Sequence, residues 1–220
     1  LEALKEMCAA HGVKLCLDCI SSIGTVPVNL EGVYLASCAS GKGLRSYPGV
    51  AMVFYHHEPQ PAPDRLPRYL DLGYYAQQQG IPFTFSSNLL HALHAAVKHV
   101  DWEKRFSGLV EMSTFLRTRL LEHGFDLVAG DARTSPAVVT IALPAELDSV
   151  QIGGLMQDSG FLLSCHSEYL RRRNWIQICL MGECTLEKVT SAVNALNRVC
   201  CRRRATAPQL DAPQTVVSPG

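Results

Sequence analysis

The segment VYLASCASGKGLRSYPGVAMVFY (residues 33–55) consists of two apolar runs on either side of a glycine-rich turn. The runs at 33–38 and 49–55 are rich in branched and aromatic residues, which is typical of buried strands. A single lysine, Lys42, lies between two glycines on the turn. The segment therefore predicts a strand, a turn and a second strand, with one lysine presented at the end of a sheet.

The residues before this segment predict a helix followed by a strand. Residues 1–11 have the apolar spacing of an amphipathic helix, and Gly12 ends it. Residues 13–18 (VKLCLD) form a short apolar run that ends in an acid, and we expect a buried parallel strand there. This alternation favours an α/β architecture with a mixed sheet.

The second half of the chain changes character after a proline-rich loop at 56–67 and an irregular segment at 69–87. Two helices are predicted near 88–100 and 102–123, because apolar residues recur there every three or four positions. A small α+β domain follows, with strands expected at 125–130, 137–143, 161–167 and 175–181 and helices near 148–158 and 185–201. We expect three regions: 1–100 in a mixed-sheet α/β domain, 101–203 in the small α+β domain, and 204–220 as a disordered tail.

The composition of the chain argues against several classes of function. Lys+Arg and Asp+Glu number 20 each among 220 residues, so no net charge favours nucleic acid or an anionic membrane as a partner. No apolar run approaches the roughly 18 residues that cross a bilayer. Nine cysteines without a second CxxC pair predict free thiols in a cytoplasmic protein and no metal site. The chain begins without Met, inside an expected helix, and we expect a fragment.

Lys42 does not fit the phosphate-binding pattern GxxxxGK[ST]. Gly43 stands where Ser or Thr is required, and Ala36 stands at the position of the first glycine. A lysine on a tight turn at a strand end instead suits covalent catalysis, because glycines let the amine approach a bound ring. An exposed turn lysine without function is the alternative that the local sequence leaves open.

Asp18 ends an apolar run 24 residues before Lys42. The carboxyl ends of parallel strands are where ligands bind in such sheets. A functional carboxylate there would pair with a cation, for which a protonated pyridine nitrogen is one candidate. A helix cap or a surface acid is the alternative.

Taken together, these two residues and their neighbours resemble the class V aminotransferases, which are fold-type I enzymes that use pyridoxal 5′-phosphate. The resemblance leans toward the branch with alanine–glyoxylate and 2-aminoethylphosphonate aminotransferases, covers nearly all of residues 1–200 and implies a C-terminal portion of such an enzyme. The matching segments are DCISSIG (18–24), SGKGL (40–44), PG (48–49), RYLDL (68–72), PFTFSSNLLHAL (82–93) and WIQICLMGECTLEKV (175–189).

The resemblance implies a role for each matching residue of the first half. Lys42 would form the Schiff base and shuttle the proton, and Asp18 would keep the pyridine nitrogen protonated so that the ring acts as an electron sink. Ile20 would pack on the ring, with plain core packing as the alternative. Ser21 and Ser40 would donate hydrogen bonds to the cofactor or its phosphate.

Further roles implied by the resemblance concern the partner subunit and the substrate. Thr84 would reach the phosphate of the neighbouring subunit's cofactor, which implies a homodimer; a turn hydroxyl is the alternative. Gln177 stands where the family has an arginine that clamps the substrate carboxylate, and a neutral amide cannot replace that charge. Arg173, or its neighbours Arg171 and Arg172, would then have to bind the carboxylate. The alternative for this run of three arginines is a solvated loop.

The expected function is therefore a pyridoxal-phosphate-dependent aminotransferase that moves an amino group between an amino acid or aminophosphonate and a 2-keto acid. Two alternatives stay open. One is a lyase or desulfurase on the same fold, although Cys165 and Cys179 lie on expected strands and not on a mobile loop. The other is a truncated or divergent subunit that dimerises without catalysis.

Overall fold

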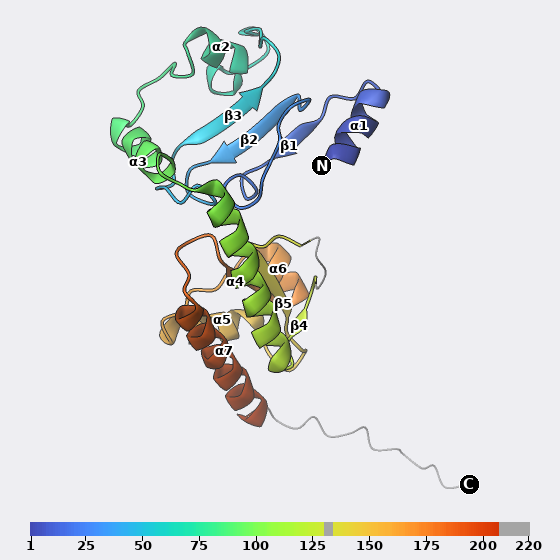
Figure 1. Cartoon of the computed structure of the whole chain (residues 1–220), viewed down its shortest axis with the longest axis vertical. Helices are drawn as coiled ribbons and strands as arrows, with labels where there is room; N and C mark the ends of the chain where they lie inside the picture. The colour runs from blue at the N-terminus through green and yellow to red at the C-terminus, as the bar shows by residue number, and fades with distance from the viewer. Residues whose placement is uncertain (130–133, 207–220) are drawn as a thin grey trace, which may run out of the picture. The chain divides into compact units, whose positions relative to one another are not determined.

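The computed structural model describes residues 1–129 and 134–206 (Figure 1). The chain divides into two compact units, Leu1–Val110 and Glu111–Gly220. The division falls inside the helix α4 (Trp102–Glu122). The domain boundaries expected near residues 100 and 203 stay predictions.

The first unit is built on a three-stranded sheet in the order β1-β2-β3. Its strands are β1 (Cys16–Asp18), β2 (Leu35–Ala39) and β3 (Ala51–Tyr55), which lie side by side in Figure 1. β1 pairs with β2 in parallel, whereas β3 pairs with β2 antiparallel. The mixed sheet confirms the α/β class that the sequence predicts.

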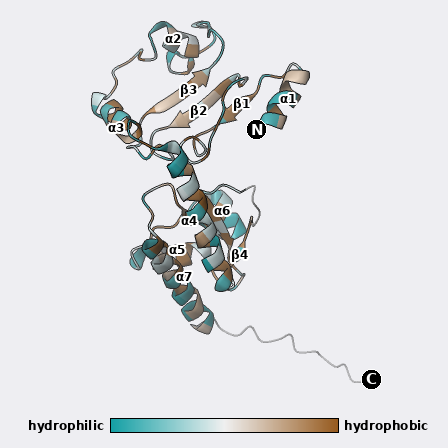
Figure 2. Ribbon diagram, in the orientation of Figure 1, coloured by the Kyte–Doolittle hydropathy of each residue, from teal (hydrophilic) through white to brown (hydrophobic). Residues whose placement is uncertain are grey.

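One face of this sheet carries the core of the first unit, in which Cys19, Val33 and Ala36 are buried. Figure 2 shows that β2 and β3 carry mainly hydrophobic residues. The expectation of a fully buried strand at 13–18 is wrong, because β1 has only three residues and its burial alternates. Cys16 and Asp18 are exposed, so the acid at the strand end is open to solvent.

The helices of the first unit are α1 (Glu2–Ala10), α2 (Leu72–Gln77) and α3 (Ser87–Val97), with a 3₁₀ turn at Arg68–Leu70. α2 and α3 begin at polar caps, Asp71 and Ser86, whereas α1 begins at Leu1 without a side-chain cap. α2 lies in the segment expected to be irregular. Its cap is Asp71, a buried carboxylate that accepts N–H groups from Ala62 at 2.8 Å, Gly73 at 3.0 Å and Tyr74 at 3.2 Å. The cap explains how a helix forms despite its neighbouring glycines.

The second unit is an antiparallel sheet covered by helices, which confirms the predicted α+β character. Its buried core includes Val139, Ile141 and Ile176 from the sheet together with Leu116 and Leu196 from the helices. The strands are β4 (Asp126–Leu127), β5 (Val138–Ala142) and β6 (Trp175–Cys179), and the helices besides α4 are α5 (Ser149–Asp158), α6 (Glu168–Arg173) and α7 (Leu186–Thr206).

Three expectations for the second unit differ from the structure. Residues 161–167 form no strand; they contribute a single bridge between Ser164 and Gln177, and alternating burial there imitated a strand pattern. The triple-arginine run, expected as a solvated loop, is the last turn of α6. α7 continues through residues 204–206, while 207–220 of the expected tail, like residue 130 of the first expected strand, lie outside the described residues.

No described helix has both the length and the apolar composition of a membrane-spanning segment.

Candidate functional site

Lys42 and Ser21 meet at one end of the first sheet. The Lys42 Nζ donates a hydrogen bond to the Ser21 Oγ at 3.1 Å, although 21 positions separate the two residues in sequence. Ser21 lies on the turn that follows β1, and Lys42 on the turn that follows β2. Because β1 and β2 are parallel neighbours, both turns leave the same edge of the sheet, where ligands bind in such folds.

The two turns cross at a pair of glycines. A Cβ built on Gly24, whose φ is +82°, would lie 2.5 Å from the carbonyl carbon and oxygen of Gly43. A Cβ on Gly43 would lie under 3.0 Å from the carbonyl oxygen of Ile23. The sequence reading explained the glycine beside Lys42 by a sharp turn. The structure adds a second reason, since only glycine allows this backbone-on-backbone contact.

Thr25 stabilises the first turn from its buried side, a role that was not predicted from the sequence. It is buried, and its Oγ1 donates to the carbonyl oxygens of Ser21 at 2.7 Å and Ser22 at 2.9 Å. A hydroxyl that bonds to carbonyls three and four positions earlier is common in short helical turns. The signal in the sequence was the hydroxyl-rich segment SSIGT (21–25), which begins three residues after the acid at the strand end.

Asp18 ends β1 with its carboxylate partly engaged. Its Oδ1 accepts the backbone N–H of Ile20 at 2.9 Å, which fixes the side chain at the strand end. In the described part of the chain, the other carboxylate oxygen has no assigned partner. Ile20 is half-buried beside it. The carboxylate is therefore oriented, exposed and able to accept a further hydrogen bond.

Ser40 is completely buried at the base of the Lys42 turn. Its hydroxyl donates to the carbonyl oxygen of Tyr47 at 2.7 Å and accepts the N–H of Val50 at 3.1 Å. Both bonds close the loop that carries Lys42. This arrangement favours a structural role for Ser40 over the cofactor contact that the resemblance implied.

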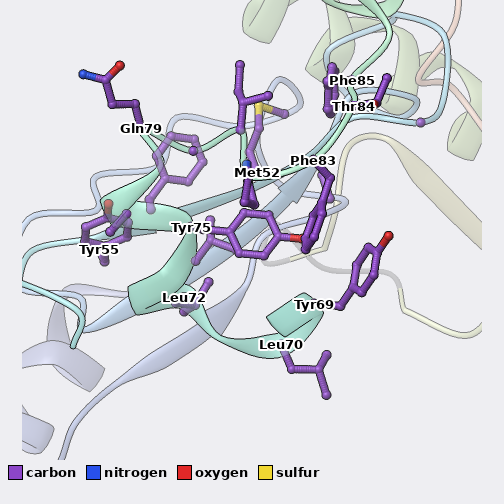
Figure 3. Close-up of a pocket in the computed structure, with 18 residues that line it drawn as sticks. Met52, Tyr55, Tyr69, Leu70, Leu72, Tyr75, Gln79, Phe83, Thr84 and Phe85 are labelled. Carbon is purple, nitrogen blue, oxygen red and sulfur yellow. The ribbon is translucent and has the colours of Figure 1, made fainter. Parts of the chain in front are cut away.

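Thr84 lies at a separate place in the first unit, beside a cavity of about 860 Å³ (Figure 3). β3 and residues 69–85 line this cavity, and the rings of Tyr69 and Phe83 stack there at 4.3 Å. Neither Asp18 nor Lys42 lines it. Within one chain, Thr84 and Lys42 therefore do not line the same cavity.

Gln177 and Arg173 belong to the second unit. The Gln177 Nε2 donates to the Thr140 Oγ1 at 3.0 Å, across the pair of strands β5 and β6. The Arg173 guanidinium lies 4.0 Å from the ring centroid of Tyr169 and 5.4 Å from that of Trp175. Both side chains are thus already engaged, by a neutral hydrogen bond and by cation–π contacts respectively.

None of the nine cysteines, all of which lie in the described part of the chain, forms a disulfide bond. Cys165 lies in the core of the second unit, and burial raises the pKa of its thiol. Cys179 is exposed at the end of β6, and its Sγ is 3.9 Å from the Ser164 Oγ. Within residues 1–129 and 134–206, no group of three or more His, Cys, Asp or Glu side chains has the arrangement of a metal site.

Comparison of the sequence with known proteins gives relatives of one kind. No protein-family model matches the chain. A 2-aminoethylphosphonate–pyruvate transaminase of Lactiplantibacillus plantarum is 25% identical over 178 residues, which are 74% of this chain and 48% of the relative. An uncharacterised aminotransferase of Methanocaldococcus jannaschii is 24% identical over 171 residues, which are 72% of this chain and 44% of the relative.

The chain resembles the class V aminotransferases in sequence. The chain spans about half the length of the curated proteins it matches. The ureidoglycine–glyoxylate aminotransferase of Bacillus subtilis has a TM-score of 0.79 at 21% identity, with 95% of this chain and 58% of that chain covered. The alanine–glyoxylate aminotransferase of Nostoc sp. has a TM-score of 0.76 at 24% identity, with 89% and 56% covered. These two structures show that the chain has their fold.

Proposed function

We propose that this chain forms the Lys42-bearing part of a pyridoxal-phosphate-dependent aminotransferase. The reaction moves an amino group between an amino acid or aminophosphonate and a 2-keto acid. The observation that carries the proposal is the placement of an exposed amine and an oriented carboxylate, Lys42 and Asp18, after adjacent parallel strands. The names of the relatives support it, since two of them are 2-aminoethylphosphonate–pyruvate transaminases.

The residues at this edge fit the chemistry of pyridoxal phosphate. Its aldehyde requires an amine that it can reach, and Lys42 is exposed at this edge of the sheet. Its ring nitrogen requires a carboxylate to stay protonated, and Asp18 has one oxygen without an assigned partner in the described part of the chain. When bound, the cofactor supplies the carbonyl carbon that captures the amino group and the ring that delocalises negative charge.

The chain's own residues would divide the remaining work. Lys42 offers its Nζ for the covalent bond and then, once free, takes and returns the proton of the substrate carbon. The Asp18 carboxylate holds a positive charge at the ring nitrogen, and Ile20 excludes water from one side of it. We also propose that Gln177 and Arg173 contact the substrate. Gln177 would donate a hydrogen bond to the acidic group of the substrate, and Arg173 would pair with it as a cation.

We also propose a homodimer in the cytoplasm, in which Thr84 binds the phosphate at the partner's site. Exposed apolar residues beside Thr84 support an interface, because Tyr69 and Leu70 are 72% and 70% exposed. Nine cysteines that form no disulfide support a reducing compartment. Sedimentation velocity with a Tyr69→Asp variant tests the interface, and an unchanged dimer in that variant would argue against it.

The test of the activity begins with the covalent bond. The purified chain is mixed with pyridoxal phosphate, reduced with borohydride and digested, and mass spectrometry locates the adduct. We expect it on Lys42, to be lost in Lys42→Ala and to persist in Lys98→Ala, which removes another exposed lysine. An adduct spread evenly over surface lysines would contradict the proposal.

Half-reactions with alanine and with 2-aminoethylphosphonate then identify the amino donor. Conversion of the cofactor to its amine form by either compound supports amino transfer. A Lys42 adduct that neither donor converts would favour a lyase. The absence of any Lys42 adduct would favour the alternative of a non-catalytic subunit. The match to about half the length of the relatives makes this alternative worth testing.

A further inference from the structure

The side-chain amine of Lys42 is held by a hydrogen bond. The bond from Nζ to the Ser21 Oγ, at 3.1 Å, has the length of an ordinary hydrogen bond. A lysine side chain has four rotatable bonds, so an exposed amine samples many positions unless a partner selects one of them. Ser21 is the partner that the structure gives it.

The position of the Ser21 hydroxyl is set by the backbone beneath it. The buried Thr25 donates to the Ser21 carbonyl at 2.7 Å, and the N–H of Ser22 donates to the carbonyl of Cys19 at 3.1 Å. Gly24 and Gly43 press the turn of Ser21 against the turn of Lys42. Both ends of the Lys42–Ser21 bond therefore lie on backbones that are held against each other.

The chemistry of the partner matters as much as its position. A carboxylate at this place would favour the ammonium form of the lysine, which cannot attack a carbonyl. A hydroxyl is neutral, so it can accept a hydrogen bond from the amine without opposing loss of the proton. It also breaks at small cost when the amine has to form a covalent bond.

We infer that Ser21 is the positioning residue of Lys42, whose hydroxyl holds the amine in one place at the carboxyl end of β1 and β2. The inference rests on the proposed function for the reaction that the amine serves, whereas the positioning is a property of the chain without any ligand. It replaces the direct cofactor contact that the resemblance implied for Ser21. A nucleophile held near its attack geometry reacts faster than one that must find it.

The first test needs no cofactor. The lysines are converted to ¹³C-dimethyl-lysines, which keep one N–H donor, and Lys42→Arg assigns the Lys42 methyl signal. We expect slower reorientation of this signal than of the exposed lysines. Ser21→Ala should bring its relaxation to their level, Ser21→Thr should preserve it, and Ser22→Ala, the same change one position away, should not alter it. The signals of the other lysines report whether each variant is folded.

The second test measures how fast pyridoxal phosphate forms its reducible adduct on Lys42. We expect Ser21→Ala to slow this rate by about three- to tenfold, the effect of one ordinary hydrogen bond, and Ser21→Thr to restore it. Ser22→Ala should react like the unmodified sequence.

The two tests separate the inference from the proposed function. If Lys42 is restrained by Ser21 but never forms the adduct, the proposed function fails and the positioning stands. If Ser21→Ala leaves both the relaxation of Lys42 and the adduct rate unchanged in a folded protein, the positioning is refuted.

Discussion

The carbonyl oxygen of Ile23 occupies the space that a side chain at Gly43 would need. A Cβ there would lie under 3.0 Å from this oxygen, and neither the oxygen nor the backbone behind it can rotate away. Gly43 has no left-handed φ, so the restriction is steric and not conformational. The backbone of the neighbouring turn, at Ile23, therefore leaves room only for glycine at the position after Lys42.

We expect Gly43→Ala to destabilise the first unit by roughly 1–3 kcal/mol, because the backbone of one turn has to move. The urea midpoint of the first unit, followed by hydrogen exchange, measures this loss. Gly108→Ala is the control, since a Cβ at Gly108 in α4 meets nothing within 4 Å. It should leave the midpoint unchanged or raise it slightly. Equal midpoints for the two variants would contradict the steric account.

Gly153 and Gly154 offer a matched pair within one helix, α5. A Cβ at Gly153 would lie under 3.0 Å from the Sγ of the buried Cys165, whereas one at Gly154 meets nothing within 4 Å. We expect Gly153→Ala to cost roughly 1–3 kcal/mol of stability and Gly154→Ala to gain up to about 1 kcal/mol. Adding Cys165→Ala should recover part of the loss in Gly153→Ala but none in Gly154→Ala. Additive effects in the double variant would place the clash elsewhere.

Asn174 ties the end of α6 to the segment before α5. Its side-chain nitrogen donates to the carbonyl oxygen of Leu147 at 2.7 Å, and its oxygen accepts the N–H of Ser149 at 2.9 Å. Its φ of +56° is also a left-handed value that few residues adopt. We expect Asn174→Ala to cost roughly 2–4 kcal/mol, because it loses both the bonds and the backbone preference.

Asn174→Gly separates the two contributions, because glycine accepts the left-handed backbone but lacks the amide. It should fall between the natural sequence and Asn174→Ala in thermal and urea denaturation. A glycine variant as stable as the natural sequence would show that the amide bonds contribute nothing.

We expect the buried thiol of Cys200 to make the stability of the second unit fall at alkaline pH. Burial raises the pKa of its thiol from 9.0 to about 11, with Arg204 opposing the shift. The unfolded thiol loses its proton from about pH 9, while the folded thiol keeps it until about pH 11, so stability should fall as pH rises through this window. Cys200→Ala should flatten this fall in urea midpoint, and Cys201→Ala, its exposed neighbour on α7, should not. Identical pH profiles for the two variants would exclude the buried thiol as the cause.

The order of helices and strands could be predicted largely because apolar spacing reports which residues face a core. The strands at 35–39 and 51–55 and the long helix of residues 102–122 are examples. At 161–167 the same spacing predicted a strand, but this segment pairs with β6 only at the single bridge between Ser164 and Gln177. The short α2 was missed because its cap, Asp71, draws its partners from both its own helix and the loop at Ala62.

The candidate site could be predicted at the level of residue types but not of contacts. Lys42 and Asp18 were found because each follows an apolar run, which places them at strand ends. The crossing of Gly24 and Gly43 depends on how two turns meet in space, and spacing along one chain does not report it. For the same reason the sequence does not report that the Ser40 hydroxyl already donates to the Tyr47 carbonyl and accepts the Val50 N–H within the loop.

The crossing of the two turns also bears on the order of folding. Ser21 and Lys42 are 21 residues apart, so chain closure brings them together on a sub-microsecond to microsecond scale, well before slower rearrangements. Their backbones can meet only once β1 and β2 have paired in register, because Gly24 and Gly43 fit each other at one alignment. The pairing of β1 with β2 thus determines where Lys42 is placed. If one strand slipped by one residue, the amine of Lys42 would no longer lie at the site.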